Sequence, residues 1–206
     1  AIATQQTGFV LIAQMRSWLP DAVGGILWFG VDDANTAVLT PMYASITEIP
    51  ECYRRGNGSM TEFSWTSAFW IHNWVANMAY NRYEPMIRDI RPVQKELEDS
   101  YVDLVKNTDA KALELLKSSP AQATAYLTEV CGKVANEATA RWKKLGEYLL
   151  VKYMDGNVKK EKDGKFEENG YGQIVSPNFP GYSQEYYDQV AKSSEAKHLE
   201  VPKKDK

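Results

Sequence analysis

The sequence has very few of the side chains that build metal centres and disulfide frameworks. Its 206 residues include only two cysteines, Cys52 and Cys131, and two histidines, His72 and His198. Two distant cysteines make no disulfide network and match no zinc spacing, so we expect two buried thiols, with a single disulfide as the alternative. We therefore expect no metal site and no cofactor in this chain.

The chain also lacks an excess of positive charge and a long apolar run. Lys and Arg number 24 against 27 Asp and Glu, and the net charge is −3, so we expect no nucleic-acid partner. Without an apolar run of about 18 residues, we expect no membrane span. The first residues show no signal core and the sequence does not begin with Met, so it starts either after processing or within a longer protein.

What the sequence does contain is ordinary globular composition, 44% hydrophobic and 12% aromatic, with strand signals first. Apolar runs at 9–15, 25–31 and 37–40 are separated by turn residues and predict antiparallel strands between about residues 6 and 45. Their nearly continuous hydrophobicity suits strands that are covered on both faces. Three strands cannot form such a sheet alone, so we expect further strands in polypeptide that is missing here.

The sequence predicts that residues 1–50 form the strands of the sheet and that residues 51–156 form a mostly helical segment that packs on it. A helix from about Ser64 has apolar residues on all sides, so we expect its Trp65, Phe69, Trp70 and Trp74 in the core. Pro85 and Pro92 should end or kink helices, and 93–106 and 110–117 read as two separate ones. A long helix over 121–155 has the clearest apolar periodicity, with Leu127, Cys131, Val134, Ala138, Trp142, Leu145 and Leu149 on one face.

Residues 157–206 predict a polar tail. Asp163-Gly164 fits the turn of a small hairpin, 170–181 reads as a Gly/Pro loop, and Ser183 fits the start of a last short helix. The basic residues of 197–206 are typical of a frayed end.

The residues alone provide no nucleophile–base pair at a recognisable spacing. Arg16 ends the first strand, where it could bind a carboxylate in a substrate pocket. A structural ion pair, for instance with Asp32 or Asp33, is the favoured alternative. His72 is expected to be a hydrogen-bonded core residue. Function does not follow from these features.

Several motifs resemble, in order, the downstream half of the cysteine dipeptidases related to dipeptidase A of lactic bacteria. The resemblance covers roughly residues 6–155. It is carried by 14–20 (QMRSWLP), 24–30 (GGILWFG), 40–43 (TPMY), 63–70 (FSWTSAFW) and 88–94 (RDIRPVQ).

This resemblance implies an α+β fold, namely the C-terminal part of an N-terminal-nucleophile (Ntn) hydrolase αββα sandwich followed by the helical segment. It implies a cysteine nucleophile at the mature N-terminus, whose α-amino group acts as the base. Residue one is Ala1, and neither Cys52 nor Cys131 has a free amino group, so we expect the catalytic cysteine upstream and this chain alone inactive.

The implied substrate is a dipeptide, and the implied protein partner is the N-terminal part of the same protein. Arg16 is the one candidate for the substrate pocket. An oligomer is left open, and export is slightly favoured over the cytoplasm by family habit. Side-chain specificity is left undetermined. A stand-alone, non-catalytic interaction domain that uses its aromatic helices is the alternative, and a related acylase is a third reading.

Overall fold

The computed structural model describes residues 3–174 and 181–194 of the chain. The chain divides into two compact units, 1–151 and 152–206, and each is described by itself. Helices and small antiparallel sheets give the α+β class that the sequence predicts. None of the helices in these described ranges combines the length and apolarity that crossing a bilayer requires.

The first unit begins with a three-stranded antiparallel sheet. Its strands are β1 (Phe9–Met15), β2 (Gly25–Val31) and β3 (Thr40–Tyr43), in the order β1-β2-β3, which confirms the predicted meander. A short helix, α1 (Asp21–Gly24), lies in the first connection. The third strand begins later than the predicted 37–40, because the N–H of Ala37 closes a turn on the carbonyl of Asp33.

The two edges of this sheet differ in chemistry. At the β3 edge, the N–H of Tyr43 donates to Cys131 Sγ at 3.3 Å, and Sγ donates to the carbonyl of Pro41 at 3.4 Å. Pro41 itself has no N–H to offer, which is typical of an edge position. The β3 edge is therefore closed by α4 (Pro120–Tyr153), the helix that carries Cys131.

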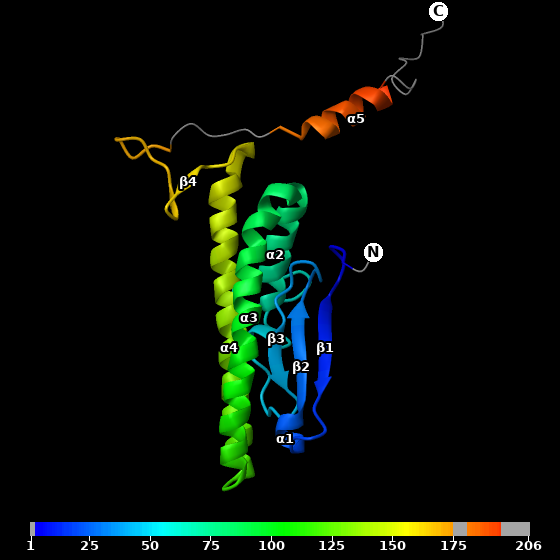
Figure 1. Ribbon diagram of the computed structural model, residues 1–206, viewed down its shortest axis with the longest axis vertical. Helices are drawn as coiled ribbons and strands as arrows, with labels where there is room; N and C mark the ends of the chain where they lie inside the picture. Colours follow the sequence, from blue (N-terminus) through cyan, green and yellow to red (C-terminus); the bar gives the residue numbers. More distant parts are fainter. Residues whose placement is uncertain (1–2, 175–180, 195–206) are drawn as a thin grey trace, which may run out of the picture. The chain divides into compact units, whose positions relative to one another are not determined.

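The β1 edge is open and apolar. Within the described residues β1 pairs only with β2, and it lies on the side of the sheet away from α3 (Tyr83–Leu116) and α4 (Figure 1). No charged residue interrupts its sequence, and the exposed fractions are 60% for Phe9, 48% for Leu11, 54% for Ile12 and 75% for Met15. Edge strands of complete proteins usually carry charge, proline or a bulge that prevents further pairing. β1 has none of these protections.

The register shows which backbone groups face outward from β1. The Arg16 N–H donates to Gly24 O and the Asp32 N–H to Gly8 O, so the even-numbered residues of this strand point their backbone groups at β2. Four N–H groups consequently point away from the sheet, those of Phe9, Leu11, Ala13 and Met15.

The helices follow the sheet. After the 3₁₀ turn η1 (Glu51–Tyr53) come α2 (Ala68–Asn81), α3 and α4. α3 and α4 run antiparallel side by side (Figure 1), and Arg141 of α4 forms an ion pair with Glu96 of α3. The predicted long helix is confirmed with bounds that differ by one residue at the start and two at the end. Its predicted apolar face is buried from Leu127 to Leu149.

The break predicted at Pro85 is confirmed, since α2 ends at Asn81, whereas the break predicted at Pro92 is wrong. Pro85 lies in the first turn of α3, where its missing N–H would have no helical acceptor. Pro92 lies inside α3, and the helix continues through it to Leu116, so 93–106 and 110–117 belong to one helix. Met86, Ile90 and Gln94 are buried on both sides of Pro92, and this packing holds the helix together across the lost hydrogen bond.

The predicted deep burial of the aromatic residues before and in α2 is also wrong. Trp65 precedes the helix and is 52% exposed, while Trp70 and Trp74 are half-buried. α2 packs closely on α4, since a Cβ at Gly146 would lie 2.5 Å from the ring of Trp74. Such an approach requires a residue without a side chain at Gly146 of α4, because the ring of Trp74 already fills the space above it.

The second unit contains a short hairpin, β4 (Glu161–Lys162) and β5 (Lys165–Phe166), and the helix α5 (Gln184–Ser194). Asp163 and Gly164 have φ of 52° and 73°, as the hairpin turn requires, which confirms the predicted turn. The long helix ends at Tyr153 and is followed by the 3₁₀ turn η2 (Met154–Gly156). His198, the predicted basic end at 197–206 and residues 175–180 of the predicted loop lie outside the described residues.

Candidate functional site

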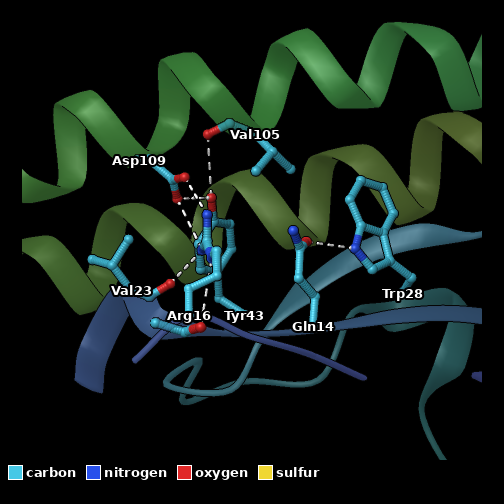
Figure 2. Close-up of polar contacts among 8 residues, drawn as sticks. Gln14, Arg16, Val23, Trp28, Tyr43, Val105 and Asp109 are labelled. Atoms are coloured by element: carbon cyan, nitrogen blue, oxygen red, sulfur yellow. Dashed lines mark hydrogen bonds and ion pairs between the residues drawn. The ribbon is translucent and has the colours of Figure 1, made fainter. Parts of the chain in front are cut away.

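Arg16 lies at the end of β1 and points toward α3. Its guanidinium forms a bidentate ion pair with Asp109, from NH1 to Oδ2 and from NH2 to Oδ1 at 3.2 Å. NH2 also donates to Val23 O at 2.5 Å and Nε to Gly24 O at 3.5 Å. Figure 2 shows Arg16 held between the α3 carboxylate and the carbonyls of the β1–β2 connection. The side chains of Arg16 and Asp109 are 7% and 17% exposed.

Tyr43 completes this group of three side chains. Its hydroxyl donates to Asp109 Oδ1 at 2.6 Å, and the guanidinium of Arg16 lies 5.9 Å from its ring centre. Burial, and after it the Asp109 carboxylate, raises the pKa of Tyr43 well above its ordinary value. The hydroxyl is therefore protonated at neutral pH and acts as a donor. We call Arg16, Tyr43 and Asp109 the Arg16 cluster.

The Arg16 cluster corresponds to the structural ion pair that the sequence favoured, but with a different partner. The suggested partners Asp32 and Asp33 are wrong, since Asp109 comes from a helix far along the chain. Four hydrogen bonds already use most of the guanidinium's donors. A substrate-binding role for Arg16 stays a prediction.

Asp32 and Asp33 form a second buried acidic site at the end of β2. Asp32 Oδ1 accepts from Asn73 Nδ2 at 2.8 Å, whereas Oδ2 has no hydrogen-bond partner among the described residues. Asp33 accepts hydrogen bonds from Thr36 and Tyr80. Burial raises the pKa of Asp32, although the bond from Asn73 opposes this. Asp32 has φ of 67°, a strained conformation for a residue other than glycine, so this turn is held by its surroundings.

Both cysteines are free and buried, as expected. Burial raises the pKa of each thiol to about 11. A thiol with such a pKa is almost entirely protonated at neutral pH, and the thiolate is the reactive form. Cys52 and Cys131 are therefore poor nucleophiles in this structure.

His72 is a buried core residue that stacks on Trp142, with ring centres 5.0 Å apart. Burial lowers its pKa to about 3, so the ring is neutral. The predicted hydrogen bonding is not found at Nδ1, which has no partner among the described residues. A neutral buried imidazole of this kind is not in the imidazolium form that acts as a general acid.

A pocket of about 350 Å³ lies between the sheet and the start of α2. Phe29 and Val31 of β2 form one wall, Phe69 and Trp70 of α2 another, and the loop 54–60 a third. The lining is mainly apolar, and Arg54 and Arg55 are its charged members. Within the described ranges no group of three or more His, Cys, Asp or Glu side chains is placed to hold a metal ion.

Three of these site residues were missed by sequence reasoning. Asp109 lies four residues after the buried Val105 on α3, so a carboxylate at a buried helix position was the available signal. Tyr43 closes the TPMY motif at the end of a strand. Arg55 lies in the loop after η1, and nothing in the sequence distinguishes it.

Two comparisons bear on these sites. Residues 1–96 match the sequence pattern of peptidase family C69. A protein described as a probable dipeptidase, from Latilactobacillus sakei, is 30% identical over 142 residues, which cover 68% of this chain and 28% of that relative. The matched part thus spans little more than a quarter of the relative's length. The resemblance found in the motifs is confirmed: the chain is related to the dipeptidases, and its residues 1–96 carry the sequence pattern of peptidase family C69.

Proposed function

We propose that this chain forms the C-terminal part of a dipeptidase whose cysteine nucleophile lies in polypeptide outside this sequence. The match to peptidase family C69 and the relative described as a probable dipeptidase support a peptidase. The intact protein would be an αββα sandwich, with this chain supplying strands of one sheet and the helices that cover it. Its partners would be a dipeptide substrate and the N-terminal part of the same protein.

The open β1 edge is the observation that carries this proposal. β1 offers four outward N–H groups and exposes apolar side chains on both faces. A strand added beside it would satisfy the backbone groups, and a second sheet would bury Phe9, Leu11 and Leu27. The opposite edge cannot extend in this way, because Cys131 and Pro41 close it. Growth of the sheet is therefore favoured on the β1 side alone.

The proposed chemistry is acyl transfer through a thioester. The α-amino group of the N-terminal cysteine takes the thiol proton, and the sulfur attacks the carbonyl carbon of the scissile peptide bond. The carbon–nitrogen bond breaks, the proton passes to the leaving amine, and the first amino acid stays as a thioester. Water then hydrolyses the thioester and restores the thiol. Neither Cys52 nor Cys131 suits this role, because each is buried with a raised pKa.

The test uses the full-length protein and a variant of it with Cys52→Ala and Cys131→Ala. We expect both proteins to hydrolyse Leu-Leu at similar rates, and iodoacetamide to abolish both activities by alkylating a cysteine outside this sequence. The residues 1–206 alone should show no hydrolysis. Loss of activity in the folded double variant, or hydrolysis by the isolated chain, would overturn the proposal.

A stand-alone interaction domain is the second candidate, and the exposed aromatic residues favour it. Phe63 and Trp65 pack edge-on at 4.6 Å, Trp65 packs on Trp74 at 5.4 Å, and Lys143 lies 4.9 Å above the ring of Trp65. Such a surface group can dock a partner. Light scattering separates the candidates, since an interaction domain should be a monodisperse monomer on its own, whereas an open β1 edge should self-associate.

A further inference from the structure

The pocket beside β2 combines an apolar interior with an unbalanced positive rim. Phe29 and Val31 of β2, Tyr53 of η1, and Phe69 and Trp70 of α2 supply apolar walls. At about 350 Å³ it lies near the lower end of the range for small-molecule pockets, which suits one amino-acid side chain with its backbone groups.

Two exposed arginines at this rim have no carboxylate partner among the described residues. Arg54 donates one long hydrogen bond, 3.4 Å, to Ile49 O, and no bond or ion pair is found for Arg55 in the same residues. The acidic residue of η1, Glu51, is turned to Asn57 and Thr66 instead. The only other basic residue among 1–55 is Arg16, which Asp109 neutralises.

The pocket wall is tightly built rather than loose. Trp70 Nε1 donates to Ser59 O at 3.1 Å, which ties α2 to the loop. Gly58 has φ of 80°, and a Cβ there would lie 2.9 Å from Trp70 Cδ1. Only glycine allows this close approach, so the loop holds the arginines at a defined edge of the apolar space.

We infer that this pocket binds the C-terminal residue of a peptide substrate, with Arg54 and Arg55 taking its free carboxylate and the apolar walls taking its side chain. The inference rests on the proposed function and names a substrate class within it, dipeptides that end in an apolar residue. A molecule with a carboxylate and an apolar body complements both properties of the pocket. Arginine also suits the planar carboxylate, which it binds with two parallel hydrogen bonds.

The kinetic test uses the full-length protein with Arg54→Gln and Arg55→Gln together, and Leu-Leu, Leu-Leu amide and Leu-Gly as substrates. We expect the wild type to have a lower KM for Leu-Leu than for the other two. The double variant should raise KM for Leu-Leu by about 10- to 100-fold with little change in kcat, and leave KM for the amide unchanged. Arg88→Gln, an exposed arginine on α3, is the matched control and should change neither.

A binding measurement decides the inference even when no hydrolysis is found. N-acetyl-leucine and its amide are titrated into the same protein, and the indole N–H resonance of Trp70 is followed, with Trp70→Phe used for assignment. The carboxylate form should shift this resonance and the amide should not, and the double variant should lose the shift. An equal response to acid and amide, or no response, overturns the inference. Absence of dipeptide hydrolysis in the wild type with intact binding refutes the proposed function alone.

Discussion

Asp109→Asn in the full-length protein tests whether the Arg16 cluster holds α3 on the sheet. The substitution keeps the shape of the side chain and an oxygen for Tyr43, but it removes the charge that balances Arg16. That guanidinium is 7% exposed, so its charge would stay buried without a carboxylate. Removing one partner of a buried pair costs about 3–5 kcal/mol, and we expect about 3 kcal/mol because Asp109 is partly exposed.

Urea denaturation measures this loss of stability. With an m-value of about 2–3 kcal/mol/M, the midpoint should fall by about 1–1.5 M. Asp99→Asn on the same helix is the control, because Asp99 pairs with Lys95 where both side chains are largely exposed. That change should cost no more than about 0.5 kcal/mol.

Arg16→Met supplies the second half of a double-mutant cycle. In the Arg16→Met background Asp109 has no cation to balance, so Asp109→Asn should be neutral or stabilising there. Equal costs of Asp109→Asn in both backgrounds, or a cost no larger than that of the Asp99 control, would refute the claim that the pair is buried and coupled.

Three further predictions concern the helices and the thiols. Gly146→Ala should destabilise the protein by about 1–3 kcal/mol, because its Cβ would lie 2.5 Å from the indole ring of Trp74. Gly132→Ala on the same helix is the control and should stabilise by about 0.5–1 kcal/mol, because no atom lies within 4 Å of the added Cβ. Urea midpoints of the two variants that move in the same direction would contradict this packing. Burial lowers the pKa of His72 to about 3, so below about pH 6.5 the unfolded chain binds a proton at His72 that the folded protein does not bind. The free energy of unfolding should therefore fall as pH drops from 6.5 toward 3, by up to about 1.4 kcal/mol per pH unit. His72→Phe should remove that part of the slope, and a slope unchanged by the substitution counts against a neutral buried ring. Cys52 and Cys131 should react with a thiol reagent at pH 7 only after denaturation, since both are buried with pKa values of about 11; rapid reaction in the native protein would contradict their burial.

The parts of the fold that the sequence predicted are those with a strong local period. The long helix is an example, because its apolar steps of three and four from Leu127 to Leu149 match one face of α4. The strands 9–15 and 25–31 were predicted with their observed bounds, since turn residues flank them. The Asp163-Gly164 turn was found for the same reason.

The failures all depend on tertiary contacts. Pro92 was expected to break α3, but burial on both sides of it outweighs one missing hydrogen bond. Trp65 was expected in the core, yet it precedes α2 and packs on Phe63 and Trp74 at the surface, where it is 52% exposed. The partner of Arg16 could not be named from sequence, because Asp109 is separated from it by 93 positions. The pocket likewise joins a strand, a loop and a helix.

The central claim is that the sheet continues beyond β1 into polypeptide of the same protein. Amide hydrogen exchange of the full-length protein, resolved by residue, tests it at the outward N–H groups of Phe9, Leu11, Ala13 and Met15. A strand paired there predicts slow exchange at all four, comparable to the inward N–H groups of the same strand. Fast exchange at these four positions beside a protected set of inward groups would show that the edge stays open, and would contradict the account.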